Sequence, residues 1–270
     1  MGRKISLAYL TIPSVNPLDQ IKIAKDAGYD YVSLRTIPMG QKGEPQIKLE
    51  KDPALFRRIE NALKEYEMPV LDVELVRVKE DLPNDFRSAF ECAAKLGAKN
   101  VLSSVWTNDM EYAFDGISKI AEQGRDFGLN INLEFPIISG IRTIDSALDM
   151  VNRVNAPNLK ILVDMLYAHW NHDDGEKIHS INPDKFGIIH LCDSPKDEQK
   201  YREKVDIMRG AREYVGMGAI NLREILAALP ANPCAIEIPN ISYIEKYGRF
   251  GHAKKCLEHA RRFFKECGLD

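Results

Sequence analysis

The stretch KILVDMLYAHW (residues 160–170) begins like a buried strand and changes character at an acidic residue. Ile161, Leu162 and Val163 are the aliphatic residues expected of a strand inside a domain. Asp164 follows them directly. A carboxylate at this point is either a helix cap or turn residue, or a ligand at the mouth of a barrel. The rest of the chain bears on which of the two applies.

Short apolar runs of this kind alternate with amphipathic stretches along the whole chain. Eight runs predict strands, at residues 5–12, 31–35, 70–76, 100–106, 130–136, 160–165, 187–193 and 234–239. The stretches between them have helical periodicity, and glycine ends three of them, at Gly28, Gly97 and Gly128. Glycine adopts the left-handed conformation that ends a helix without a side-chain clash. The chain therefore predicts alternating strands and helices.

This alternation indicates an α/β fold with a parallel sheet. Eight strand–helix units in a chain of 270 residues predict a single (β/α)8 TIM barrel. A doubly wound dinucleotide-binding sheet would place a GxGxxG turn after its first strand, and the sequence has no such turn there. No linker or low-complexity stretch divides residues 1–270, so we expect one domain.

Composition excludes several classes of protein. The chain is 44% hydrophobic and 29% charged with a formal net charge of −3, which argues against a nucleic-acid-binding protein. Its five cysteines are scattered without CxxC spacing, as in a reducing compartment. The apolar start of the chain is too short for a signal peptide, and no run reaches the roughly 18–20 apolar residues of a membrane span. We expect a soluble, cytoplasmic protein that binds no membrane.

The last four predicted strands end in ionisable residues, namely Glu134, Asp164, His190 and Glu237. Barrel enzymes carry their chemistry at the carboxyl ends of the strands, so these side chains should converge. Three carboxylates in a partly dry site would repel one another, and a divalent cation removes that conflict. Oxygen and imidazole donors without a thiolate favour Mn²⁺, with Mg²⁺, Co²⁺ or Zn²⁺ as alternatives. The other interpretation keeps each residue as an isolated cap or turn acid.

Five segments of the chain carry a resemblance to a known family. They are NLEFP (132–136), ILVD (161–164), IIHLCDSP (188–195), AREYVGMGAINLREILAAL (211–229) and AIEIPN (235–240). These segments resemble the xylose isomerase-like TIM barrel family, which includes sugar phosphate isomerases and epimerases, ketose 3-epimerases and inosose isomerases. In that family the matching residues bind one divalent metal, which implies that role for Glu134, Asp164, His190 and Glu237. The resemblance also implies that Glu134 and Glu237 form the acid–base pair.

The resemblance also points to substrate-binding residues. Arg212 matches a family arginine that precedes a PGxG-like turn, although the proline is missing here. Family members often have a histidine three residues after the strand-six aspartate. Here that position is Tyr167, so either Tyr167 replaces the histidine or His169 serves from a shifted loop.

The ends of two other predicted strands supply further candidates for substrate binding. Arg35 should project inward, where it would bind a carboxylate or phosphate or else lie on the solvated rim. Trp106 would form an apolar wall for a sugar ring or cap the core. Asp72 and Glu74 share a face of one strand and are expected to fill the barrel interior, with a catalytic part as the alternative. His252 is expected at the surface of the last helix.

These features predict a metal-dependent isomerase or epimerase that acts on a ketose, sugar phosphate or keto-polyol through an enediolate. The alternative enzyme is a dehydratase or lyase of a cyclic keto-polyol or shikimate-like acid. An abasic-site endonuclease has a similar barrel, but its three zinc ions need more histidine ligands than the strand ends here provide. A non-catalytic metabolite-binding subunit is the remaining alternative. The substrate would be a small sugar-like molecule, and homodimers are common among the proteins that the chain resembles.

Overall fold

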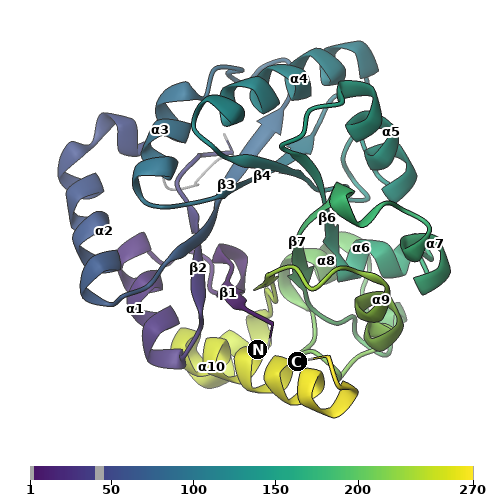
Figure 1. Ribbon diagram of the computed structural model, residues 1–270. Helices are drawn as coiled ribbons and strands as arrows, with labels where there is room; N and C mark the ends of the chain where they lie inside the picture. The colour runs from purple at the N-terminus through teal and green to yellow at the C-terminus, as the bar shows by residue number, and fades with distance from the viewer. Residues whose placement is uncertain (1–2, 40–45, 270) are drawn as a thin grey trace.

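Eight parallel strands form a closed barrel in sequence order in the computed structural model, which describes residues 3–39 and 46–269 (Figure 1). β1 pairs with β2 on one side and with β8 on the other, which closes the sheet. The TIM-barrel prediction is confirmed. The strands are β1 (Ile5–Leu7), β2 (Tyr31–Arg35), β3 (Val70–Val78), β4 (Asn100–Val105), β5 (Asn130–Leu133), β6 (Leu159–Asp164), β7 (Phe186–Leu191) and β8 (Cys234–Ile236).

Helices form an outer ring around the strands (Figure 1). Their apolar faces and the outward faces of the strands make one large buried cluster. The final helix packs against the first, so the ring closes as the barrel does. The helices are α1 (Pro17–Ala27), α2 (Pro53–Glu65), α3 (Arg87–Lys95), α4 (Met110–Asp126), α5 (Ile144–Val154), α6 (Met165–Trp170), α7 (Gly175–His179), α8 (Lys204–Gly210), α9 (Leu222–Ala228) and α10 (Ile241–Cys267).

A smaller apolar cluster fills the barrel interior. It includes Leu162, Ile188 and Ala235, each of which is buried. Each of these residues precedes an ionisable residue by two positions, and side chains two apart in a strand share a face. The apolar cluster therefore forms a floor one layer below the charged residues at the carboxyl ends of the strands, and it excludes water from that side.

Several details differ from the expectation. The strands predicted at 130–136 and 234–239 end earlier, at Leu133 and Ile236. The first strand ends at Leu7, and a 3₁₀ turn, η1 (Tyr9–Thr11), replaces the rest of the predicted run. The expectation that His252 lies at the surface is wrong, because α10 packs that face against the barrel. The His252 side chain is fully buried, with Nε2 2.8 Å from the carbonyl oxygen of Ile238 and Nδ1 3.2 Å from the hydroxyl of Tyr214.

Throughout residues 3–39 and 46–269, no helix combines the length and the apolar character that crossing a bilayer requires.

Candidate metal centre and active site

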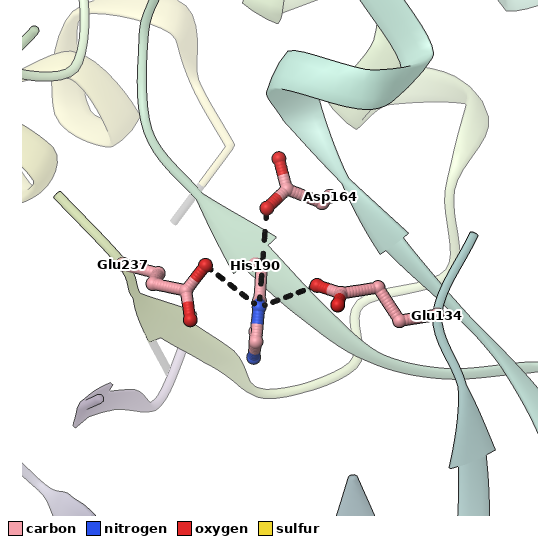
Figure 2. A group of neighbouring side chains, drawn as sticks. All are labelled: Glu134, Asp164, His190 and Glu237. Carbon is pink, nitrogen blue, oxygen red and sulfur yellow. Dashed lines mark ion pairs between the residues drawn. The ribbon is translucent and has the colours of Figure 1, made fainter. Parts of the chain in front are cut away.

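The four ionisable residues predicted at the strand ends converge at one mouth of the barrel (Figure 2). Asp164 is the last residue of β6 and His190 lies near the end of β7, while Glu134 and Glu237 directly follow β5 and β8. One ligand atom from each lies within 4.8 Å of the others, and all four residues are buried. The structure thus brings together every residue predicted to hold a metal.

The imidazole of His190 is the centre of this cluster (Figure 2). Its Nδ1 lies 3.2 Å from Glu134 Oε1, 3.5 Å from Glu237 Oε2 and 4.0 Å from Asp164 Oδ2. Despite these short distances, neither nitrogen of His190 has a partner in hydrogen-bond geometry among residues 3–39 and 46–269, and Glu134 Oε1 has none there either. Leaving such a buried polar atom unpaired costs about 1–3 kcal/mol. Three carboxylates and one imidazole, of which Glu134 Oε1 and both ring nitrogens make no hydrogen bond to residues 3–39 and 46–269, are a donor set that fits a divalent cation.

Asp164 both caps a helix and takes part in the ionisable cluster, the two roles that its sequence context allowed. One oxygen, Oδ1, accepts a hydrogen bond of 2.8 Å from the backbone N–H of Leu166 and so caps α6. The other oxygen, Oδ2, faces His190 and lies 2.7 Å from a guanidinium nitrogen of Arg212. The cap holds the carboxylate in place, so that its second oxygen points into the cluster.

Arg212 lies behind the carboxylates with only 1% of its side chain exposed. Its Nη1 is 2.7 Å from Asp164 Oδ2, and its Nη2 is 3.1 Å from Glu237 Oε2 and 3.4 Å from the hydroxyl of Tyr167. Its Nε donates to the carbonyl oxygen of Met208 at 3.1 Å. Every guanidinium nitrogen thus has a protein partner, which fixes the two carboxylates and offsets part of their charge. Direct contact of Arg212 with a substrate stays a prediction.

The surroundings of the two glutamates drive their protonation in opposite directions. Burial raises the pKa of Glu134 to about 7, although the neighbouring His190 acts the other way. Burial also disfavours the ionised form of Glu237, but the positive charges of His190 and Arg212 outweigh it and lower the pKa of Glu237 to about 2. Two carboxylates with separated proton affinities are typical of acid–base pairs in enzymes.

The structure distinguishes the positions of Tyr167 and His169. Tyr167 is buried beside the cluster, where its hydroxyl accepts the hydrogen bond from Arg212. Burial, followed by the charge of Glu134, raises its pKa well above the usual value. His169 points elsewhere, with its Nε2 3.6 Å from Oε1 of Glu198. Tyr167 is therefore the one next to the cluster, and its contact with a substrate stays a prediction.

Arg35 and Trp106 lie on other sides of the barrel mouth. The Arg35 guanidinium is 2.8 Å from Oε2 of Glu74, and both side chains are buried. Trp106 is half-buried after β4, with its indole N–H donating to Ser104 Oγ at 2.8 Å. Asp72 and Glu74 are fully buried inside the barrel, as predicted for polar filling. Burial, followed by the charge of Glu74, raises the pKa of Asp72 to about 7.

A family comparison agrees with this geometry. The family model described as xylose isomerase-like TIM barrel matches residues 21–267. The chain belongs to this family.

Curated relatives in this family include inosose isomerases. The chain is 23% identical over 237 residues to the inosose isomerase of Bacillus velezensis, covering 81% of this chain and 80% of the relative. The inosose isomerase of Bacillus subtilis is 23% identical over 160 residues, or 55% of each chain.

Solved structures share the fold. A crystal structure of the IolI protein with a bound zinc atom superposes with a TM-score of 0.75 at 20% identity, covering 94% of this chain and 96% of the other. D-allulose 3-epimerase from Methylomonas sp., solved with D-allulose, superposes with a TM-score of 0.71 at 16% identity, covering 97% and 98%.

The turn after Arg212, which lacks the proline common in the family, is held by an aspartate that the sequence reasoning missed. The carboxylate of Asp193 accepts backbone hydrogen bonds of 3.1 Å from Gly216 and 2.9 Å from Gly218. A Cβ at Gly218 would overlap this carboxylate and the carbonyl oxygen of Ser194. The signal in the sequence was an aspartate at the end of the run at 187–193, but its partners lie more than twenty residues further along the chain.

Proposed function

We propose that the protein is a divalent-metal-dependent isomerase or epimerase of a ketose, sugar phosphate or keto-polyol. The observation that carries this proposal is the buried cluster of Glu134, Asp164, His190 and Glu237 at the carboxyl ends of the barrel strands. The names of the inosose isomerase relatives and of the D-allulose 3-epimerase structure support the same class of substrate. Mn²⁺ is the cation we expect, and the zinc in the IolI structure makes Zn²⁺ the main alternative.

The residues of the cluster divide the chemistry between them. A divalent cation held there would polarise a carbonyl oxygen and the adjacent hydroxyl as a Lewis acid. Glu134 and Glu237 approach His190 from opposite sides (Figure 2), so one carboxylate can remove the proton beside the carbonyl and the other can return a proton. Arg212 keeps Asp164 and Glu237 in position.

Other residues at the mouth would contact the substrate. Tyr167 presents a hydroxyl beside the cluster, and Trp106 offers an apolar surface suited to a sugar ring. A dehydratase or lyase would begin with the same proton removal and would then expel a β-hydroxyl as water. The experiment below tests the shared step, and analysis of the product distinguishes the two outcomes.

Exchange of substrate hydrogen with solvent tests the proposal. In deuterium oxide, the Mn²⁺-loaded protein should introduce deuterium at the carbon beside the carbonyl of an accepted ketose or keto-polyol, as measured by NMR. Glu134→Gln and Glu237→Gln should each slow this exchange by about 10²–10⁴-fold, the usual contribution of a general acid or base. Glu122→Gln, on the exposed face of α4, is the matched control and should exchange at the wild-type rate.

Each variant also loses a ligand oxygen, so its metal content must be measured by elemental analysis on the same sample. If Glu134→Gln and Glu237→Gln both retain metal and full exchange, the glutamates are ligands only, and the proposed acid–base roles are wrong.

A further inference from the structure

A cavity of about 480 Å³ opens beside the barrel mouth, between η1, α1 and α2. Its lining includes Arg35 from the end of β2, Arg58 from α2 and the first turn of α1. β1 lies between β2 and β8 in the closed sheet. Arg35 and Glu237 therefore flank β1 at the same end of the barrel, which places the cavity on the same side of the barrel as the metal cluster.

Arg35 lines this cavity, and one of its donors makes no hydrogen bond to the described part of the chain. Its side chain is 7% exposed; Nη2 lies 2.8 Å from Glu74 Oε2, and Nη1 lies 3.6 Å from the sulfur of Met39. The guanidinium carbon is 4.6 Å from the centre of the Tyr9 ring, which fixes the plane of the group. Nε is buried and has no hydrogen-bond partner within the described ranges 3–39 and 46–269. A buried, charged donor without an acceptor is unfavourable, and an oxygen anion in the cavity would satisfy it.

The rest of the lining is also suited to an anion. Arg58 is exposed and has neither a hydrogen-bond nor an ion-pair partner within residues 3–39 and 46–269. The N-terminus of α1, where Pro17 follows the cap Asn16, contributes the positive end of a helix dipole. The one carboxylate in the lining is Asp19, which is held 2.7 Å from Nδ2 of Asn16. The carboxylates of Glu74 and Asp19 formally balance the charges of Arg35 and Arg58, so the positive character of the lining comes from the N-terminal end of α1, and it suits a small anionic group.

We propose that this cavity holds an anionic group of the substrate, a carboxylate or a phosphate monoester, while the carbonyl end of the same molecule lies at the metal cluster. The inference rests on the proposed function and narrows its substrate to a sugar acid or a sugar phosphate. Arg35 makes the buried contact through its free Nε, and Arg58 covers the group from the solvent side. Neutral ketoses then lack the interaction that orients the substrate.

Three sugar probes of similar size test the charge preference. They are D-fructose, D-fructose 6-phosphate and 5-keto-D-gluconate, and their dissociation constants are measured by calorimetry on the Mn²⁺-loaded protein at constant ionic strength. At least one charged probe should bind about tenfold more tightly than fructose, as expected of one charge-assisted contact. The charged probe that binds more tightly identifies the group as phosphate or carboxylate.

Variants locate the preference in the cavity. Arg58→Gln should remove most of it, and Arg35→Lys, which keeps the ion pair with Glu74 but lacks the Nε donor, should weaken it. Arg57→Gln, exposed on the same helix and outside the cavity lining, is the control and should bind like the wild type. Fructose binding within twofold of both charged probes would overturn the inference. So would a preference that survives in both Arg58→Gln and Arg35→Lys, or no binding of either charged probe at 20 mM.

The same titrations on chelator-treated protein separate this inference from the proposed function. A charge preference that persists without metal and disappears in Arg58→Gln supports the anion site, whatever the outcome of the exchange experiment. A charge preference that appears only with Mn²⁺ and is unchanged in Arg58→Gln reflects chelation of the metal by the probe. That result contradicts the anion site, while the proposed function stands.

Discussion

Replacing Arg212 by Met should destabilise the metal-free protein strongly. The guanidinium is 1% exposed and lies 2.7 Å from Asp164 Oδ2 and 3.1 Å from Glu237 Oε2. Methionine has a similar length and an apolar body, so the packing against Tyr167 is largely kept while the charge and its donors are lost. Two buried carboxylates then face each other and His190 without their cation.

The magnitude follows from the burial of both carboxylates. Breaking a buried ion pair by removing one partner costs about 3–5 kcal/mol, because the remaining charge stays out of water. For a protein of this size, each kcal/mol lowers the melting temperature by about 2–4 °C, so a decrease of about 6–20 °C is expected. Saturating Mn²⁺ should reduce the difference, because a bound cation takes over part of the neutralisation that Arg212 provides.

Urea unfolding of the wild type and of Arg212→Met, each with a chelator and with Mn²⁺, measures both effects. Arg209→Gln is the matched control, because this arginine is exposed three residues earlier in α8, and its free energy of unfolding should stay within about 0.5 kcal/mol of the wild type. A chelator-treated Arg212→Met protein that unfolds within about 1 kcal/mol of the wild type would refute the reasoning.

Three further outcomes follow from the same site. Purified protein should retain close to one divalent ion per chain by elemental analysis. Mn²⁺ at 100 times its dissociation constant should add about 2.7 kcal/mol to the unfolding free energy. Little retained metal and no stabilisation would argue against the site. Burial raises the pKa of Glu134 to about 7, and the charges of Glu237 and Glu134 outweigh burial to raise that of His190 well above its usual value. Glu134 therefore holds its proton below about pH 7, and His190 holds one through pH 7; a cation must displace both. The calorimetric Mn²⁺ affinity should thus rise about tenfold or more per pH unit up to pH 7 and continue to rise above it, whereas a flat profile would contradict this. With a net charge of −3, binding to an abasic-site DNA duplex should be undetectable at physiological salt, and micromolar binding would favour a nuclease.

The barrel could be predicted because each strand has a recognisable local sequence pattern. Runs such as Ile161–Val163 are apolar on both faces, as strands covered by helices must be, and glycines at Gly28, Gly97 and Gly128 mark where helices end. The short helices α6, α7 and α8 could not be predicted in this way, because five to seven residues hold too few turns for a periodic pattern. His252 was misplaced because the sequence does not state which face of the last helix meets the barrel.

The metal cluster was predictable for a different reason. Parallel strands place their carboxyl ends at one mouth of a barrel, so residues at strand ends become neighbours although 103 positions separate Glu134 from Glu237. The partners of side chains that leave the strands follow no such rule. Nothing in the sequence indicated that Arg212 would be enclosed by protein acceptors, or that Arg35 would pair with Glu74 and keep one free donor.

The fold and the site are linked through the cost of excluding water. The apolar floor of Leu162, Ile188 and Ala235 makes the mouth above it a medium of low polarity, in which charges interact far more strongly than in water. Without a cation that setting is unfavourable, since both nitrogens of His190 and an oxygen of Glu134 are buried with no hydrogen-bond partner in the part of the chain that the structure describes. The same low polarity strengthens the attraction of the cluster for a cation and sharpens the difference in proton affinity between Glu134 and Glu237. The layer that makes the buried charges unfavourable is therefore what would make the cluster a strong metal site and an effective pair of acid and base.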